Sequence, residues 1–193
     1  FQDGYFIALD DQTSSIYLSA LENGTSWDPL DVAQRNDSPD KWIDLLVRPK
    51  ELWLFGNEST SVYYNNGGDD GFPYVPNPSV AIPYGTAAPD SPAILAGSPI
   101  WLANDLTVRY ASGYTAQRVS THAVEYAISI MDTFNDAESF VYSEKGHDFY
   151  ALNFPTEGQT WVYDRTSGRI RGGSPAPSIV SGRTLLSSEP SRT

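Results

Sequence analysis

The chain contains no cysteine among its 193 residues, so neither disulfide bonds nor thiolate chemistry is available to it. It also lacks an apolar run long enough to cross a membrane, and it shows no signal peptide. Basic residues are scarce, because 12 Lys and Arg stand against 24 Asp and Glu and give a net charge of −12. A field of this sign repels nucleic acid and anionic lipid, which argues against recognition of DNA or RNA through a basic face.

Histidine is nearly absent as well, with His122 and His147 as the two examples. Without cysteine, a zinc site would need both histidines together with carboxylates, so structural histidines are the better interpretation. No phosphate-binding loop, dinucleotide fingerprint or nucleophile elbow occurs in the sequence. We therefore expect no cofactor, no bound metal and no catalytic residue, and hence a protein that is not an enzyme.

What the chain does have is a repeat. Hydrophobic segments centred on an aromatic residue recur at Tyr5, Trp53, Trp101 and Tyr150, in steps of 48, 48 and 49 residues. A period of about 40 to 50 residues with several short strands per unit is typical of a β-propeller blade. Runs of β-branched and aromatic residues flank each centre and are separated by turn residues. The sequence therefore predicts an all-β, propeller-like fold with a three-stranded antiparallel meander in each unit.

The repeat also predicts where the strands lie. The central strands are expected at residues 4–9, 51–55, 99–103 and 148–152. Preceding strands are expected at 42–47, 93–96 and 139–143, and following strands at 16–20, 61–65, 106–111 and 160–164. This amounts to about three and a half blades, whereas closed propellers carry four to eight. We expect the chain to be a fragment of a larger propeller, with open edges that would pair with further strands.

The domain organisation follows from a change in composition near the end of the chain. Residues 1–171 are expected to form the propeller segment, whereas residues 172–193 are rich in Gly, Ser and Pro. Such a composition is typical of a flexible, low-complexity tail, because it buries too little apolar surface to fold.

Three segments between the expected strands differ from the rest. Residues 26–34 are interpreted as a short turn or helical excursion, and the Pro-, Gly- and Asp-rich residues 66–92 as a long, semi-rigid loop. Residues 120–128 are the best helix candidate, with Ser120 or Thr121 as the N-cap and Val124 and Ile128 as an apolar pair one turn apart.

Carboxylates are the most abundant candidates for chemistry. They are dense at Asp28, Asp31, Asp37, Asp40, Asp44, Asp69 and Asp70. A glycosidase needs two carboxyl groups roughly 5 to 9.5 Å apart across one sugar bond, and the sequence cannot show such convergence. The spacing also fails the pattern of an EF-hand calcium loop. Solvated or turn-capping carboxylates are the better interpretation.

Aromatic side chains around the Pro-rich loop are the candidates for binding. Phe72, Tyr74, Tyr84 and Tyr63 flank this loop and are expected to be exposed. Because protein interfaces favour tyrosine and other aromatic residues, we interpret these four as a candidate partner interface. Stacking on sugars is the other role open to them.

A series of short stretches occurs in a fixed order between Asp3 and Gly168. They are Asp3-Gly4-Tyr5-Phe6-Ile7, Thr25-Ser26-Trp27-Asp28, Glu51-Leu52-Trp53-Leu54-Phe55-Gly56, Gly113-Tyr114-Thr115, Gln117-Arg118-Val119-Ser120-Thr121-His122-Ala123-Val124-Glu125, Gly146-His147-Asp148-Phe149-Tyr150, Phe154-Pro155-Thr156 and Thr160-Trp161-Val162-Tyr163-Asp164. The ordered set resembles the tail-nozzle proteins of short-tailed bacteriophages, also called packaged-DNA stabilisation proteins. After Gly168 the family pattern continues with Trp-His and a nearby Arg, whereas this chain reads Arg169-Ile170-Arg171, so the last blade is expected to depart from the family.

The resemblance implies a structural virion protein of the phage tail, assembled in the host cytoplasm. Copies would form a ring, a hexamer in such proteins, below the portal and its adaptor proteins. The ring would extend the DNA conduit, let DNA pass with weak and non-specific contact, and meet a tail needle or plug. The alternative is a carbohydrate-binding or glycoside-hydrolysing propeller of a phage or bacterial surface, which would use the exposed aromatic residues and acids.

Overall fold

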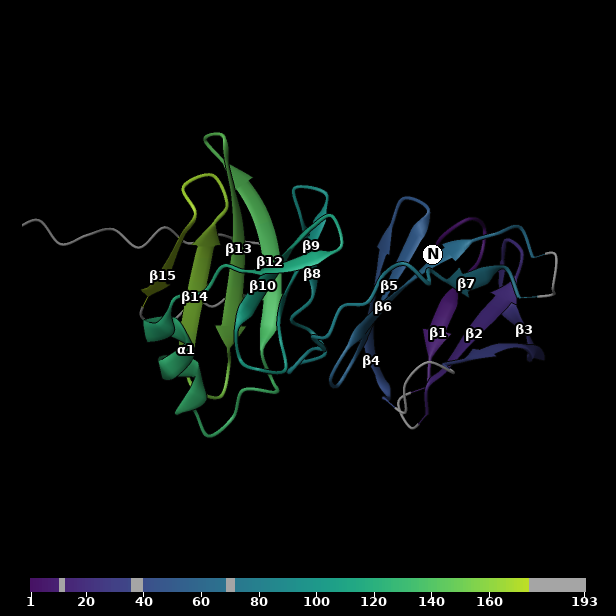
Figure 1. Ribbon diagram of the computed structural model, residues 1–193, viewed down its shortest axis with the longest axis horizontal. Coiled ribbons are helices and arrows are strands. Elements are labelled where there is room, and N and C mark those ends of the chain that lie inside the picture. The colour runs from purple at the N-terminus through teal and green to yellow at the C-terminus, as the bar shows by residue number, and fades with distance from the viewer. Residues whose placement is uncertain (11–12, 36–39, 69–71, 174–193) are drawn as a thin grey trace, which may run out of the picture.

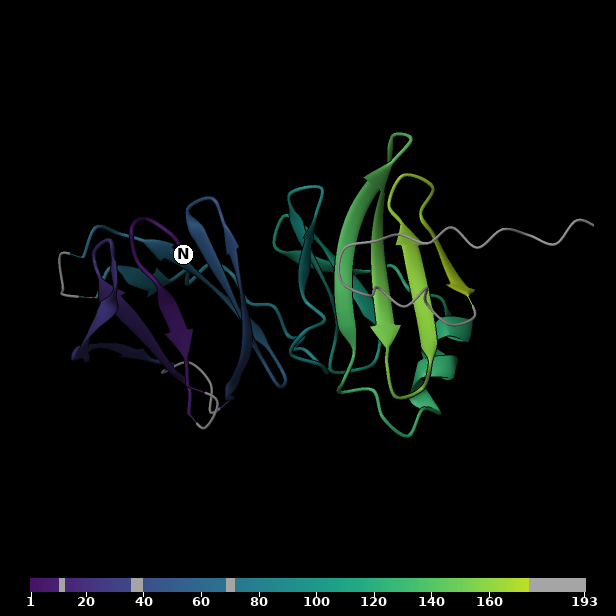
Figure 2. The same ribbon diagram turned by 180° about the vertical axis from the view of Figure 1, so that it is seen from behind.

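The computed structural model describes residues 1–10, 13–35, 40–68 and 72–173. Within these ranges 15 strands form four antiparallel sheets, and one helix accompanies them. The sheets follow one another in chain order along the longest axis of the molecule (Figure 1 and Figure 2). The prediction of an all-β, blade-by-blade architecture is therefore confirmed. In the part of the chain described, no helix is long and apolar enough to span a membrane.

Each sheet is a meander of strands adjacent in the sequence. The first blade contains β1 (Ile7–Leu9), β2 (Ser15–Ala20) and β3 (Asn23–Gln34). The second contains β4 (Trp42–Arg48), β5 (Glu51–Gly56), β6 (Thr60–Asn65) and β7 (Tyr74–Pro76). The third contains β8 (Ala93–Leu95), β9 (Ser98–Leu102), β10 (Val108–Ser112) and β11 (Thr115–Arg118). The fourth contains β12 (Glu138–Glu144), β13 (His147–Phe154), β14 (Gln159–Asp164) and β15 (Arg169–Gly173).

The predicted strands are all present, but each blade has one strand more than the sequence predicted. The additional strands are β3, β7, β11 and β15, each at the end of its meander. Residues 26–34 belong to β3, so the expected turn or helix is wrong there; antiparallel pairing with β2 makes this segment extended despite Pro29. A bulge in that pairing accommodates the irregular sequence.

The fourth blade does not end at Asp164, because β15 pairs with β14 from Thr160 to Asp164. Ile170 packs toward the core while Arg169 and Arg171 are exposed, which is the alternation of a strand with one buried face. Gly172 and Gly173 still belong to β15. From residue 174 on, the expected flexible tail lies outside the described residues.

Three apolar clusters lie between consecutive blades and make up the core. Between the first and second blades, Ile16 and Leu18 pack against Leu52 and Leu54. Between the second and third, the cluster is formed by Trp53, Phe55, Val62, Ile82, Trp101, Ala103 and Ala111. Between the third and fourth, it is formed chiefly by Ile100, Leu102, Val108, Tyr150, Leu152, Phe154 and Tyr163. Each inner blade thus buries both faces, which stabilises the row of sheets.

The 48-residue repeat places the strands correctly but not the faces of its aromatic residues. Trp53 points from the second blade toward the third, whereas Trp101 points from the third back toward the second. The Phe55 and Trp101 rings meet across this interface with centroids 5.3 Å apart. Both strands follow a two-residue turn, but Trp53 is the third residue of β5 and Trp101 is the fourth residue of β9. Because side chains alternate along a strand, this difference of one position reverses the face.

The predicted helix is present as α1 (His122–Ser129), with Thr121 at the N-cap position. The Thr121 side chain makes no capping bond; instead the Ser120 hydroxyl donates to Glu125 Oε1 at 2.5 Å. Val124 and Ile128 are buried and join the cluster between the third and fourth blades. These contacts hold the helix against the core, and Figure 1 shows α1 beside β14 and β15 of the fourth blade.

Candidate functional site

A buried ion pair ties the end of the first blade to a turn of the second. Arg35 Nη1 lies 3.4 Å from Asp40 Oδ2, and both side chains are almost fully buried. The carboxylate of Asp40 accepts hydrogen bonds from the backbone N–H groups of Asn57, Glu58 and Ser59 at 2.8, 3.0 and 3.0 Å. One carboxylate thus satisfies the amides of the whole β5–β6 turn.

Arg35 also contacts two hydroxyl groups and one aromatic ring of the second blade. Its Nη2 donates to the hydroxyls of Ser59 and Ser61 at 2.9 and 3.0 Å, and its guanidinium lies 4.4 Å from the centre of the Trp42 ring. Such a desolvated, fully hydrogen-bonded pair fixes a single arrangement of the blades rather than binding a ligand. Asp40 was predicted to be a solvated or turn-capping acid, and it is a buried capping acid.

The connection between the second and third blades is unusually close. The N–H of Thr86 donates to the carbonyl of Gly56 at 2.9 Å, and Trp101 Nε1 donates to the carbonyl of Gly85 at 3.1 Å. A Cβ atom at Gly85 would overlap backbone atoms of Gly56 and Asn57. The connection is thus in direct backbone contact with the second blade and bonded to the third.

Asp44 on β4 is a half-buried carboxyl whose pKa is affected by a second acid. Burial raises the pKa of Asp44 to about 7, the charge of Asp90 adds to the rise, and the N–H of Leu45, 2.7 Å from Oδ1, opposes it. A folded-state pKa above the ordinary 3.8 means that the folded state binds the proton more tightly than the unfolded state. Ionisation of Asp44 therefore costs stability progressively as the pH rises from about 4 to about 7.

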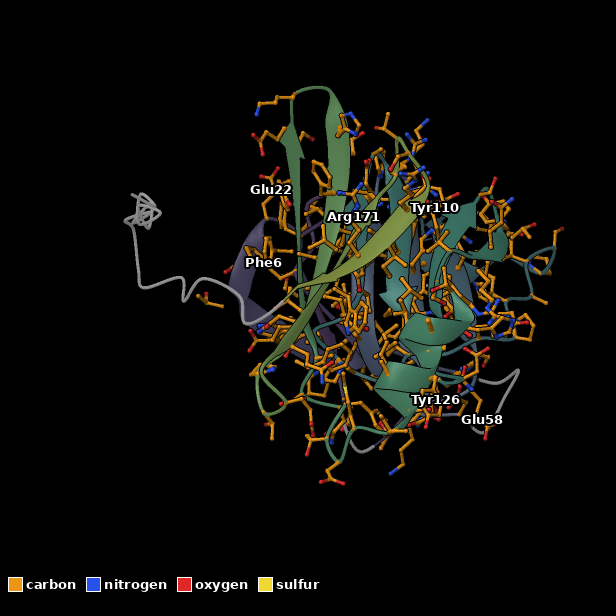
Figure 3. The ribbon with its side chains drawn as sticks, turned by 90° about the vertical axis from the view of Figure 1, so that its left-hand side faces the viewer. Phe6, Glu22, Glu58, Tyr110, Tyr126 and Arg171 are labelled. Carbon is orange, nitrogen blue, oxygen red and sulfur yellow. The ribbon has the colours of Figure 1, made fainter. Side chains whose placement is uncertain are left out.

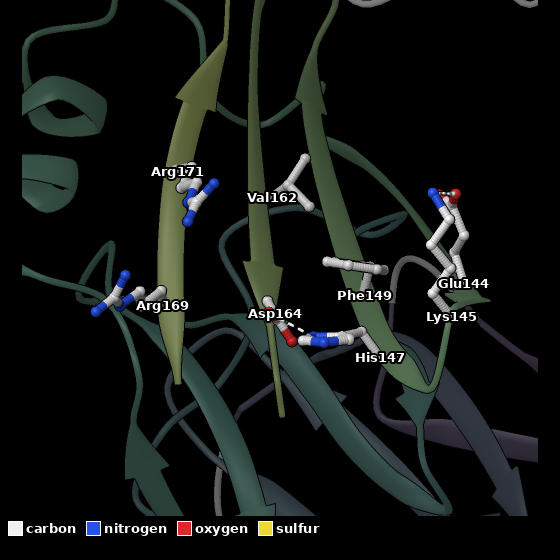
Figure 4. A pocket seen from close by; sticks show the side chains of 8 residues that line it. All are labelled: Glu144, Lys145, His147, Phe149, Val162, Asp164, Arg169 and Arg171. Carbon is white, nitrogen blue, oxygen red and sulfur yellow. Dashed lines mark hydrogen bonds and ion pairs between the residues drawn. The ribbon is translucent and has the colours of Figure 1, made fainter. Parts of the chain in front are cut away.

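The face of the fourth blade that points away from the third blade is exposed and has no covering sheet among the described residues. We call it the outer face of the fourth blade. Figure 3 views the molecule onto this face, with Arg171 on the sheet nearest the viewer. A groove of about 390 Å³ crosses it and is lined by Glu144, Lys145, His147, Phe149, Val162, Asp164, Arg169 and Arg171 (Figure 4).

Aromatic rings stack in a row across this outer face. The centroids of Phe140 and Tyr142 are 5.9 Å apart, those of Tyr142 and Phe149 are 4.9 Å apart, and those of Phe149 and His147 are 5.9 Å apart. All three pairs are stacked. The row comes from two neighbouring strands, β12 and β13, whose cross-strand register places Tyr142 opposite Phe149.

The charges of the outer face are partly paired. Asp164 Oδ2 lies 2.9 Å from His147 Nδ1, and the bond from the Ser167 hydroxyl, with a smaller contribution from His147, lowers the pKa of Asp164 to about 2. Lys145 Nζ lies 3.3 Å from Glu144 Oε1. Arg169 and Arg171 form no ion pair with any residue that the structure describes. Three basic side chains, Lys145, Arg169 and Arg171, thus line the groove with two acidic ones, Glu144 and Asp164, which leaves one net positive charge beside its apolar surface.

The four aromatic residues predicted to form an exposed partner interface are not a common surface. Tyr63 and Tyr74 are only 3% and 2% exposed, so the expectation of exposure is wrong for these two: both pack in the cluster between the first and second blades. The Tyr74 hydroxyl donates to the carbonyl of Gln2 at 3.2 Å.

Phe72 and Tyr84 are half-buried. Phe72 packs against the same cluster as Tyr63, and the ring of Tyr84 lies 3.3 Å beneath the Arg109 guanidinium carbon. A role of these two in a partner interface stays a prediction. Sequence reasoning misplaced the group because a Pro-rich loop usually runs over the surface, whereas here it carries β7 into the sheet.

The acidic and histidine side chains of the described residues do not form a metal-binding group. Among the residues described, no group of three or more such side chains is arranged to hold an ion. Asp28 and Asp31 lie on β3, while Asp37, Asp69 and Asp70 lie outside the described residues. His122 is exposed on α1, and His147 lies on the outer face of the fourth blade beside Asp164.

Sequence reasoning missed the Arg35–Asp40 pair, Gly85 and the two arginines of β15. The position of Arg35 could have indicated a specific role, because it is the first basic residue of the chain and directly precedes the second blade. The alternation Arg169-Ile170-Arg171 was also a usable strand signal. Gly85 gave none, since close backbone approach depends on two segments far apart in the sequence.

Among known proteins, the chain matches one family model over most of its length. A family model described as Phage_stabilise, bacteriophage P22 Gp10, beta-propeller, matches residues 1–183. No curated protein matches the chain. A crystal structure of a Bacteroides fragilis protein described as exported is similar at 13% identity with a TM-score of 0.43, too low to support a conclusion. The match covers 89% of this chain and 55% of that protein, so this chain spans about half its length.

Proposed function

The chain belongs to the bacteriophage P22 Gp10 family of β-propeller stabilisation proteins, and on that basis we propose that it is a structural protein of a phage tail. In this proposal copies of the chain form a ring below the portal and its adaptor proteins. The ring extends the conduit for DNA, meets a tail needle or plug, and helps to retain the packaged DNA. The match of the family model over residues 1–183 is the observation that carries the proposal.

The fold and the charge of the chain support this function. The buried clusters between consecutive blades and the Arg35–Asp40 pair join the sheets into a stiff body, which suits a wall that has to resist the pressure of packaged DNA. The net charge of −12 repels the phosphate backbone. An acidic conduit therefore lets DNA slide, whereas a basic conduit would hold it.

The proposed role is structural rather than catalytic. The strongest cluster of charged groups, Arg35 with Asp40, is buried and internally satisfied, so it offers no group to a substrate. The carbohydrate alternative requires two carboxyls that face one sugar. The charge of Asp90 does help to raise the pKa of Asp44, but Asp44 is half-buried on β4 and favours its neutral form.

Immunogold electron microscopy of purified phage particles tests the proposed location. With an antibody against this chain, we expect label at the distal tail, below the portal, in most particles. An antibody against a capsid protein serves as the control for particle integrity. Intact particles that carry capsid label but no tail label would reject the structural role and would make glycan-binding and hydrolysis assays the next step.

A further inference from the structure

The contact between the second and third blades, formed by the cluster around Trp53, Phe55 and Trp101, has a carboxyl group beside its apolar residues. We call this contact the second junction, and the carboxyl belongs to Asp44 on β4. We infer that the second junction is a proton-sensitive contact: a neutral Asp44 lets the two blades pack closely, and an ionised Asp44 loosens them. The inference concerns the chain by itself, so it does not depend on the proposed function.

The pairing of β4 with β5 shows which way Asp44 points. Asp44 is the cross-strand partner of Phe55, and such partners share one face of a sheet. Phe55 is fully buried in the second junction, where its ring lies 5.3 Å from that of Trp101. Leu46, two residues after Asp44, packs in the same cluster. Asp44 therefore lies on the face of the second blade that packs against the third.

A β-bulge separates Asp44 from the apolar residue before it. The register of β4 against β5 shifts between Trp42 and Asp44. Trp42 and Leu45 pack toward the first blade, although regular alternation would place Trp42 and Asp44 on the same face. Because the bulge turns Trp42 to the opposite side, the tryptophan fills one junction while the carboxyl faces the other.

The Asp44 carboxyl is not paired with a cation. It forms no ion pair with any residue that the structure describes, and the N–H of Leu45 lies 2.7 Å from its Oδ1. The arginines between residues 35 and 118 have carboxylate partners, namely Arg35 with Asp40, Arg48 with Glu51, Arg109 with Asp105 and Arg118 with Glu125. Lys41 and Lys50 are exposed. In the described part of these two blades, no bonded cation therefore stabilises an ionised Asp44.

A second acid acts on Asp44 from the connection that enters the third blade. This acid is Asp90, whose negative charge disfavours ionisation of Asp44. Asp90 is held in place, because its carbonyl accepts the N–H of Ser139 on β12 at 2.9 Å. Glu138, the neighbour of Ser139, is also acidic and is exposed. Repulsion between Asp44 and Asp90 therefore adds to the cost of ionising Asp44 while the blades are in contact.

The proton affinity of Asp44 gives the direction of the effect. Burial, with the charge of Asp90 as a smaller cause, raises the pKa of Asp44 from 3.8 to about 7. A closed junction thus holds the proton more tightly than an open one, in which water reaches the carboxyl. The closed form is favoured most below a pH of about 4 and loses this advantage as the pH rises to about 7. At higher pH the carboxyl is ionised in both forms, so the balance changes no further.

The opening is limited in extent and in place. The bonds from Thr86 to Gly56 and from Trp101 to Gly85 hold the second junction together, so the blades loosen without separating. The junction of the third and fourth blades is held by apolar residues and by the Tyr150 hydroxyl, which donates to the carbonyl of Ser91 at 2.8 Å. That junction therefore serves as an internal reference.

Buried single cysteines provide the test, because the chain has no cysteine of its own. Ala103 is fully buried in the second junction, and Ala137 is 1% exposed in the cluster between the third and fourth blades. Each of Ala103→Cys and Ala137→Cys is made in the chain and in its Asp44→Asn variant, in which residue 44 stays neutral. The labelling rate with 4,4′-dithiodipyridine is expressed as the ratio of the Asp44 chain to the variant, so that ionisation of the thiol cancels.

For Ala103→Cys, we expect this ratio to rise about tenfold or more between pH 5 and 7 and then to level off. For Ala137→Cys, it is expected to stay constant. A constant ratio at Ala103→Cys would overturn the inference, and so would an equal rise at Ala137→Cys, which would show a loss of stability throughout the chain. If Ala103→Cys does not fold, Ala111→Cys replaces it, since Ala111 is 1% exposed in the same cluster.

Thermal unfolding gives a second measurement that needs no cysteine. Between pH 5 and 7, the melting temperature of the chain is expected to fall relative to that of Asp44→Asn by about 4 °C or more. Asp28→Asn is the matched control, because Asp28 is exposed on β3 and its variant is expected to follow the unmodified chain. The same pH dependence in the chain and in Asp44→Asn would contradict the inference.

Discussion

Asp40→Ala is expected to lower the free energy of unfolding by about 3 to 5 kcal/mol, the usual cost of removing one partner of a buried ion pair. The substitution leaves the Arg35 guanidinium buried without its carboxylate. It also leaves three backbone N–H groups of the β5–β6 turn without their acceptor. For a chain of this length, such a loss lowers the melting temperature by roughly 6 to 20 °C.

Two variants give the measurement its controls. Asp40→Asn keeps one acceptor oxygen and nearly the same shape, so it is expected to lose less than Asp40→Ala. Asp28→Ala removes an exposed aspartate that accepts one backbone bond, from Leu30 at 2.9 Å, and is expected to cost about 1 kcal/mol or less. Thermal unfolding followed by circular dichroism separates these cases. Equal losses for Asp40→Ala and Asp28→Ala would contradict the role given to Asp40.

Gly85→Ala is expected to destabilise the junction of the second and third blades by about 3 kcal/mol or more, at the upper end of the cost of overpacking. The added methyl group would overlap backbone atoms of Gly56 and Asn57, which cannot rotate away as a flexible side chain can. Relief requires the connection to move, and movement breaks the bonds of Thr86 to Gly56 and of Trp101 to Gly85.

Gly97→Ala is the matched control for this substitution. A Cβ atom at Gly97 meets nothing within 4 Å, so that variant carries only the cost of its positive φ of 78°, about 1 kcal/mol. Thermal unfolding with near-ultraviolet circular dichroism, which reports the packing of Trp53 and Trp101, measures both. If Gly85→Ala were as stable as Gly97→Ala, the close contact between the blades would be wrong.

The sequence predicted the architecture because its signals are local. Short runs such as Glu51–Gly56 and His147–Phe154 are apolar, aromatic and bounded by turn residues, and these properties specify strands wherever they occur. The last strand of each blade was missed because its signal is weak. β11 carries only Ala116 as an apolar residue, and β3 contains Asp and Pro, so both depend on pairing with the preceding strand.

The candidate site was harder to predict because it depends on contacts across blades. The burial of Tyr63 and Tyr74 results from the first blade packing on the second, which no property of the Pro-rich loop reveals. The opposite facing of Trp53 and Trp101 depends on their positions counted from the preceding turn, since side chains one residue apart on a strand point to opposite faces. The family resemblance was available from ordered short stretches, and the family match confirms it.

The retention of DNA in particles that lack this chain tests the central claim most directly. Particles assembled in a host that expresses all phage proteins except this one would be treated with nuclease, and the protected DNA would be measured against particles complemented with the wild-type chain. The account predicts filled heads that lose their DNA without this chain and keep it after complementation. Full protection of the DNA in particles shown to lack the chain would contradict it.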